Sequence, residues 1–353
     1  MQGRIINLQR FADIASLFSQ KDVLDYTRDR DYAPYLGDTL FPSRKTQSLE
    51  LEELTAGSRI PVIASISAFD AEAEIGSREA SKLSLELAYI KRKLPISEKE
   101  LIALRSPRNA DEQKYMQGRV YNDIGQLAQG VLARVEKMSM DVLATGKLVD
   151  EDHGISLDYQ VPAEHQADMT KSGASNITWD STNTSLDILK NLTDWSDAMD
   201  VRPTRALTSM KVYRLITTNA KVLQQIYGTS TRALSQPDFD TFMQAHGLPI
   251  IRTYDNKYKK EDSKGNKTSE RYFPENRIVL MNDDPIGEKV FGPTPDESRL
   301  LSSSDIQASQ VGNVFAKVYE ETQDPVGTFT LAAATALPGF AAADEVFQAQ
   351  VIA

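Results

Sequence analysis

The sequence contains no cysteine and only three histidines among its 353 residues. The lack of cysteine excludes disulfides, cysteine-ligated zinc, iron–sulfur clusters and thiol nucleophiles. The histidines, His153, His165 and His246, lie far apart in polar or helix-end contexts, so a metal centre or a Ser-His-Asp triad has little support. We therefore expect solvated or hydrogen-bonded structural histidines and no cofactor.

Long apolar runs and an excess of basic residues are also missing. No stretch of about 18 apolar residues occurs, and residues 1–30 contain no apolar segment typical of a signal peptide, so we expect neither a membrane-spanning nor a secreted protein. Fifty acidic and 40 basic side chains give a net charge of −10, which argues against an extensive basic face for nucleic acid. Hydrophobic residues at 41% and charged residues at 25% indicate a folded globular chain, long enough for one large domain or two to three smaller ones.

Catalytic signatures are missing as well. The sequence has no GxGxxG, GxxxxGK[ST], HExxH or GxSxG motif, and we expect no enzyme. Acidic pairs such as Asp150/Asp152 could bind a hard cation, but turn and capping roles explain them more simply. The lysine-rich tract 257–267 could contact phosphate, yet Glu261 and Asp262 dilute its charge, so a solvated hairpin tip is favoured.

The strongest pattern present is that of a long helix. Apolar residues recur in steps of three and four from Val120 to Val142, Ser106-Pro107 predicts a helix start, and Gly146 predicts its end. A helix over 107–145 would be about 58 Å long. Its apolar stripe is narrow and its neighbours are rich in strands, so we expect it to lie across a sheet. Three internal glycines indicate a bend or close packing: Gly118, Gly125 and Gly130.

A long β-ribbon is predicted between Lys45 and Pro95, where apolar and polar residues alternate. The polar segment between Ile75 and Leu83 suits a hairpin tip. A ribbon of this kind is marginal alone, so we expect it to lean on a neighbouring molecule. The hypothesis is that Arg78, Glu79 and Lys82 lie at the tip, over an adjacent subunit.

The rest of the chain mixes both kinds of element. The N-terminal segment, with an amphipathic stretch over 11–18, is either an arm that lies on another molecule or a helix packed on its own domain. The second half alternates helical and extended patterns. They predict helices over 186–199 and 235–247, one helix or a pair of short ones over 212–226, a hairpin between 248–254 and 272–273, and strands over 205–208, 277–281, 326–337 and 346–352. The fold class expected is α+β.

The order of these features resembles that of a known family. The matching segments are Ile90–Pro95 at the end of the ribbon, the helix from about Ala110 to Lys147, Thr170–Trp179, Phe273–Asn276 before the strand Ile278–Leu280, and the ending Leu337-Pro338 with 344–353. In this order and spacing the chain resembles the tailed-bacteriophage major capsid proteins of the lambda-like capsid protein E family, which have the Hong Kong 97 phage fold.

The resemblance implies a domain organisation. The N-terminal arm would be residues 1–45, and the extended E-loop with its flanking strands 46–94. The P-domain with the spine helix, about 107–145, would be 95–194 plus 315–337. The A-domain would be 195–314 plus 338–353.

The resemblance also implies a function and partners. The protein would be a structural subunit that self-assembles through hexamers and pentamers into a procapsid and an icosahedral virion shell around double-stranded DNA, without catalysis. Assembly would take place in the bacterial host cytoplasm with scaffold, portal and possible decoration proteins. DNA would be contacted loosely and non-specifically, because a wall without a basic excess lets it slide, and no membrane would be bound.

Two alternatives stay open. One is an encapsulin-like nanocompartment shell protein, which resembles the same fold and would enclose a protein cargo. The other is a soluble metal-dependent hydrolase that uses Asp150, Asp152 and His153.

Overall fold

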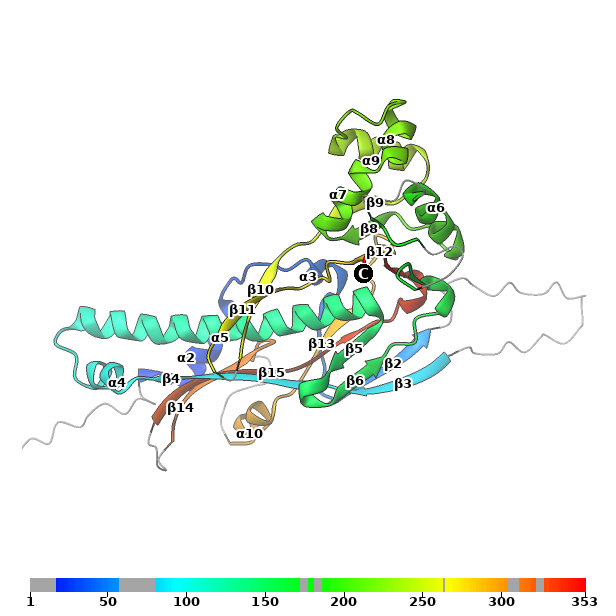
Figure 1. Ribbon diagram of the computed structural model, residues 1–353. Helices are drawn as coiled ribbons and strands as arrows, with labels where there is room; N and C mark the ends of the chain where they lie inside the picture. The colour runs from blue at the N-terminus through cyan, green and yellow to red at the C-terminus, as the bar shows by residue number, and fades with distance from the viewer. Residues whose placement is uncertain are drawn as a thin grey trace, which may run out of the picture.

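The computed structural model describes residues 17–56, 80–171, 177–180, 186–262, 264–303, 311–321 and 327–353. These residues form an elongated body along which one helix, α5 (Ala110–Thr145), runs. A second group of helices and strands rises at the C-terminal end of that helix (Figure 1). The predicted α+β class is confirmed. The strand patterns over 60–66 and 71–75, the amphipathic residues 11–16 and the polar loop 172–176 lie outside the described residues.

The first sheet is built around one long strand rich in alanine. β15 (Gly327–Gly339) pairs antiparallel with β4 (Ala88–Ile96) along one edge, and with β13 (Glu288–Gly292) and β14 (Phe315–Glu321) along the other. β1 (Ser43–Lys45) adds to β13 in parallel. The predicted strand 326–337 is therefore confirmed, although it continues through Pro338.

Helix α5 lies across this sheet, as its narrow apolar stripe predicts. Its buried side chains Leu127, Val131 and Val135 pack on the alanine face of β15, which is formed by Ala332, Ala334 and Ala336. Small side chains let the helix approach the strand closely. The helix ends where expected, because Gly146 adopts the left-handed conformation with φ 66°.

The start of α5 differs from the prediction by three residues. Ser106 ends a separate short helix, α4 (Glu98–Arg105), and Pro107 lies in the connection. Asn109 is the N-cap of α5, since its side chain accepts a hydrogen bond from the Glu112 backbone N–H at 2.8 Å. The 36-residue helix is about 54 Å long. Ser97 and Glu100 form a capping box at the start of α4. The pattern Ser97-x-x-Glu100 could therefore have predicted this helix from the sequence.

The second sheet carries the raised group of helices. Its strand order is β7 (Gln166–Asp168), β16 (Phe347–Gln350), β12 (Arg277–Met281), β8 (Arg205–Thr208) and β9 (Ile250–Thr253). Ile278 and Leu280 of β12 face the helices, whereas Val279 and Met281 face the C-terminal end of α5. The sheet is therefore buried on both faces. The helices are α6 (Ile188–Ala198), α7 (Met210–Thr218), α8 (Ala220–Tyr227) and α9 (Gln236–Ala245), all close to prediction.

One predicted hairpin is wrong. The strand expected at 248–254 does not turn back to 272–273; β9 instead pairs in parallel with β8 in the second sheet. The hydrophilic tract between them forms its own hairpin, β10 (Lys257–Glu261) with β11 (Lys267–Arg271). The physical reason is burial: Ile251 is almost fully enclosed in the sheet, while the lysine-rich strands stay at the surface. The two C-terminal strands, β15 and β16, likewise belong to different sheets.

The described part of the N-terminal segment packs on its own chain. α2 (Gln20–Asp29) buries Val23 and Leu24, and Phe18 before it contacts the N-terminal half of α5. α3 (Gly37–Leu40) and β1 follow. For residues 17–45 the structure agrees with the second of the two interpretations, a helix packed on its own domain.

Five further strands and helices lie in the described chain. They are the ribbon β2 (Glu50–Ala56) with β3 (Ala80–Glu86), the hairpin β5 (Lys147–Asp150) with β6 (Ile155–Asp158), and α10 (Pro295–Ser303).

Candidate functional site

The projecting ribbon is rooted in the body of the molecule. β2 and β3 form seven antiparallel register pairs, from Glu50↔Glu86 to Ala56↔Ala80. Leu51 and Leu85 at its base are buried in the core, and β3 passes through Leu87 directly into β4 of the first sheet. Figure 1 shows the ribbon leaving the body beside the β5–β6 hairpin. A strand that is continuous with a buried sheet gives the ribbon a fixed direction.

The candidate interface residues separate in the structure. Lys82 lies inside β3, in register with Leu54 of β2, and the pairing of the two strands continues to Ala80. Arg78 and Glu79 lie outside the described residues. That these three residues contact an adjacent subunit stays a prediction.

A buried carboxylate joins four parts of the chain that the sequence did not connect. Glu136 of α5 is fully buried, and its Oε2 accepts a hydrogen bond from Lys289 Nζ of β13 at 2.9 Å. Its Oε1 accepts hydrogen bonds from the Gly37 backbone N–H and the Tyr254 hydroxyl, both at 3.0 Å. Lys289 also donates to Asp38 Oδ1 at 2.7 Å. A buried ion pair is tolerable only when such extra hydrogen bonds complete it.

The surroundings of this carboxylate fit it closely. Gly37 is required there because a Cβ would lie 2.2 Å from Glu136 Oε2. Burial, together with the charge of Glu136, raises the pKa of the Tyr254 hydroxyl, which therefore stays a proton donor. The sequence signal was weak: Glu136, Met140 and Leu143 recur at helical spacing, which marks Glu136 as part of a second buried row.

The residues of the hydrolase alternative form a local salt bridge. Asp150 of β5 pairs with Arg134 of α5, and His153 Nδ1 lies 3.1 Å from Asp150 Oδ1. Burial opposes ionisation of Asp150, but the hydrogen bond with His153 and the charge of Arg134 outweigh it and lower its pKa. The contacts tie the β5–β6 hairpin to the helix. The side chain of Asp152 lies outside the described part of the structure.

No metal centre or membrane span is found in the described ranges. Among those residues, no three histidine, aspartate or glutamate side chains converge in a way that could hold a metal ion. The histidines lie apart: His246 Nδ1 is 2.8 Å from the Phe242 carbonyl oxygen, and His165 packs beside Phe347. No described helix is long and apolar enough to cross a membrane.

Comparison with known proteins gives a consistent result. Residues 19–351 match the family described as phage major capsid protein E. No curated protein matches the sequence. The fold is similar to that of a putative capsid protein of a prophage of Escherichia coli CFT073, with 18% identity over 96% of this chain and 97% of that one and a TM-score of 0.60. It is also similar to that of a phage-related protein from Bordetella bronchiseptica RB50, with 10% identity over 93% and 95% and a TM-score of 0.52.

The family match covers almost the whole chain, and the structural similarity covers the same extent. The elongated sheet, the helix across it and the projecting ribbon are thus the parts of a shell subunit. The chain belongs to the phage major capsid protein E family, and its role is that of a structural major capsid protein.

Proposed function

We propose that this chain assembles through hexamers and pentamers into a procapsid and then an icosahedral phage head that encloses double-stranded DNA. The observation that carries the proposal is the β2–β3 ribbon, which leaves the body from a base where Leu51 and Leu85 are buried in its own core. A two-stranded ribbon gains stability when a neighbour covers it. A projecting ribbon adds contacts between each subunit and its neighbours. Many weak interfaces of this kind together can close into a shell.

The proposed domains follow the family pattern. Residues 1–45 correspond to the arm, although 17–45 pack on the chain's own body; 46–94 correspond to the E-loop, 95–194 plus 315–337 to the P-domain, and 195–314 plus 338–353 to the A-domain. Strand pairing favours two refinements of these ranges. β13 pairs with β15 and fits the P-domain better, while β7 pairs with β16 and fits the A-domain better.

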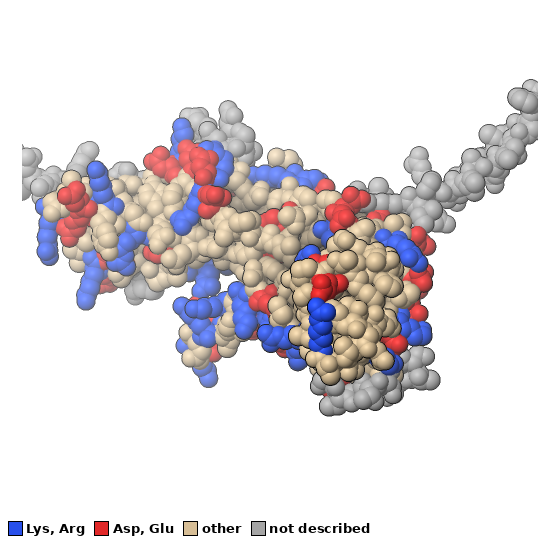
Figure 2. Space-filling view, turned by 90° about the horizontal axis from the view of Figure 1, so that it is seen from above, with Lys and Arg blue, Asp and Glu red and all other residues tan. Residues whose placement is uncertain are grey.

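The proposed partners are those of a head under construction in the host cytoplasm. We expect scaffold and portal proteins, with decoration proteins as a further possibility, and no catalytic step. Contact with DNA is proposed to be loose, in keeping with the net charge of −10. Figure 2 shows acidic and basic side chains interspersed over the described residues of one face.

The test is negative-stain electron microscopy of the purified full-length chain, together with sedimentation velocity. Closed shells of uniform size are expected. A small monodisperse particle with metal-dependent hydrolytic activity would contradict the proposal. Shells that form around a co-purified protein cargo, from a gene without portal and terminase neighbours, would favour the nanocompartment alternative.

A further inference from the structure

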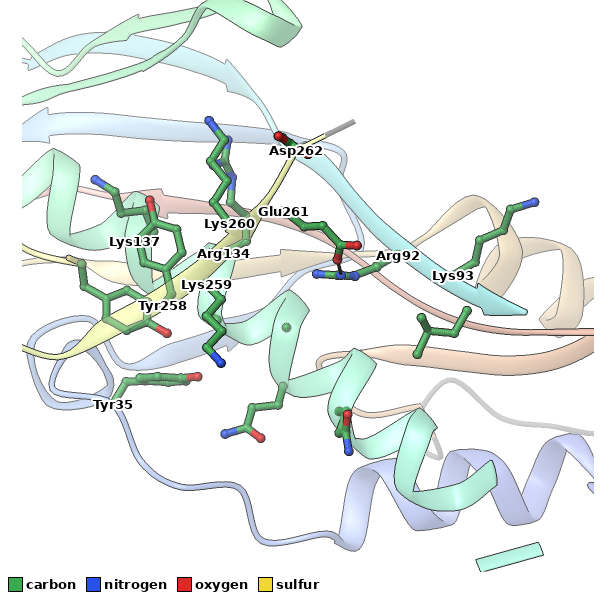
Figure 3. Close-up of a pocket in the computed structure, with 16 residues that line it drawn as sticks. Tyr35, Arg92, Lys93, Arg134, Lys137, Tyr258, Lys259, Lys260, Glu261 and Asp262 are labelled. Carbon is green, nitrogen blue, oxygen red and sulfur yellow. Dashed lines mark hydrogen bonds and ion pairs between the residues drawn. The ribbon is translucent and has the colours of Figure 1, made fainter. Parts of the chain in front are cut away.

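An open groove lies between the spine helix and the lysine-rich hairpin. Its walls are the middle of β4, one exposed face of α5 and the β10–β11 hairpin, and its volume is about 900 Å³. Figure 3 shows Arg92 of β4 reaching across to Glu261 near the hairpin end. The floor on α5 is polar and small, with Gln126, Gln129 and Gly130 exposed, and a Cβ added to Gly130 would touch nothing within 4 Å. The groove therefore has room for a chain in extended form.

The groove is basic although the protein as a whole is acidic. Six cations line it against two acids; the cations are Arg92, Lys93, Arg134, Lys137, Lys259 and Lys260. Acids outside the groove, namely Asp141, Asp150 and Glu321, pair with three of them. Lys259 and Lys260 are exposed and form no ion pair within the described ranges. These two lysines are the free positive charges of the groove.

The structure already shows what kind of group the groove accepts. Arg92 holds the carboxylate of Glu261, and the two side chains are 48% and 35% exposed. An ion pair this exposed contributes little stability, so another carboxylate can replace Glu261 at low cost. Arg92 is therefore an exchangeable carboxylate site.

The wall formed by β4 also offers backbone groups. Its nine register pairs with β15 occupy one edge of the strand, and no strand of the described chain pairs with the other edge. An open edge alternates N–H donors and C=O acceptors, which a peptide in extended form complements by strand addition. A phosphodiester backbone offers only acceptors and would meet unfavourable carbonyl oxygens. The edge thus favours a peptide over nucleic acid.

We propose that this groove docks an extended acidic segment of another polypeptide, which adds as a strand to β4 and places its carboxylates on Arg92 and Lys259, while the neighbouring Lys260, on the opposite face of β10, adds to the positive charge of the groove. Docking of this kind concerns the single subunit and does not require shell formation. Its failure would therefore leave the proposed function untouched.

The test uses a fluorescein-labelled decapeptide of alternating glutamate and threonine, with binding to the purified full-length chain followed by fluorescence anisotropy. Binding is expected, with an affinity at least tenfold lower for the double variant Lys259→Glu/Lys260→Glu. The control Lys264→Glu/Lys267→Glu changes the charge of the same hairpin equally but lies outside the groove, and it should change the affinity less than twofold. Circular dichroism checks that all variants are folded.

A second probe tests the strand edge without any substitution in the protein. The same peptide with alternate backbone nitrogens methylated keeps its charge but loses edge hydrogen bonds, and it should bind at least tenfold more weakly. Equal loss in both lysine double variants, equal binding of the methylated peptide, or no peptide binding would overturn the proposal. So would a short DNA duplex that binds more tightly than the peptide and displaces it.

Discussion

At the scale of single residues, the structure depends on a charge pair that is hidden from solvent. Glu136 and Lys289 are 0% and 3% exposed, and together with Gly37, Asp38 and Tyr254 they hold the N-terminal segment, the helix and both sheets in one arrangement. Removing one partner leaves the other charge buried without compensation. At an exposed ion pair, water solvates the charge that remains, so loss of one partner costs little stability.

We predict that Lys289→Met lowers the free energy of unfolding by about 3–5 kcal/mol, because it leaves the Glu136 carboxylate buried without its cation. The matched control is Arg44→Met, which removes the exposed partner of Glu288 on the neighbouring strand and should cost less than about 1 kcal/mol. Urea unfolding of the unassembled chain measures both. Similar losses in the two variants would show that the buried pair has no special role.

At the scale of elements, helix α5 contains three internal glycines whose surroundings differ. A Cβ at Gly118 or Gly130 would meet nothing within 4 Å, whereas at Gly125 it would lie 2.2 Å from Arg30 Nη1. Arg30 in turn contacts the hydroxyl and the ring of Tyr26 on α2. Of the two explanations the sequence left open, close packing therefore applies to Gly125 alone.

The three glycine-to-alanine variants should not change stability equally. Gly118→Ala and Gly130→Ala should each stabilise the unassembled chain by about 0.5–1 kcal/mol, since alanine restricts the unfolded chain and favours the helix. Gly125→Ala should stabilise it less, because the Arg30 guanidinium must first move out of its place between α2 and α5. Thermal unfolding of the three variants side by side checks this. A gain for Gly125→Ala equal to the other two would refute the packing argument.

The buried stripe of the same helix should not tolerate charge. Leu127→Asp or Val131→Asp places a carboxylate against the alanine face of β15 and is expected to abolish soluble folding. Gln126→Asp and Gln129→Asp, on the exposed face of the same turns, should change stability by no more than about 0.5 kcal/mol. Soluble yield and circular dichroism distinguish the two outcomes. Folded, assembly-competent Leu127→Asp protein would rule out this packing.

At the scale of the whole molecule, the chain is an elongated body from which the β2–β3 ribbon projects. Two five-stranded sheets meet at the C-terminal end of α5, and the largest core cluster includes residues from both. The body is thus one unit, from which the ribbon projects with a fixed root. A subunit of this form has several separate surfaces for neighbours, as shell assembly requires.

Charge reversal on the ribbon should disturb assembly without unfolding the subunit. In the double variant Arg78→Glu/Lys82→Glu, we expect folded protein that forms few or aberrant shells, because the ribbon no longer matches its neighbour. The charge-preserving control Arg78→Lys/Lys82→Arg should form shells. Electron microscopy and sedimentation velocity measure the outcome. Normal shells from the charge-reversed protein would mean that these residues do not lie at an interface.

Much of this architecture follows from sequence pattern alone, for a physical reason. Helix α5 and its glycine stop, helices α6 to α9 and the strands β8, β12 and β16 all carry their own signals, because periodicity and caps are local properties. The resemblance to the capsid family likewise needed only the order of such elements. The sequence was less informative where a local signal was ambiguous, as at Ser106-Pro107, which separates α4 from α5 instead of opening the long helix.

Only the tertiary structure decided which distant segments meet. Nothing in the sequence around Glu136 or Lys289 names the other as its partner, 153 positions away, and the pair forms because the fold brings α5 onto β13. The same holds for β9. It pairs in parallel with β8, whereas the short distance along the chain had predicted a hairpin with residues 272–273. The absence of cysteine and the excess of acidic over basic side chains, by contrast, are properties of the sequence alone. Contacts between remote residues depend on burial in a shared core, which no local pattern records.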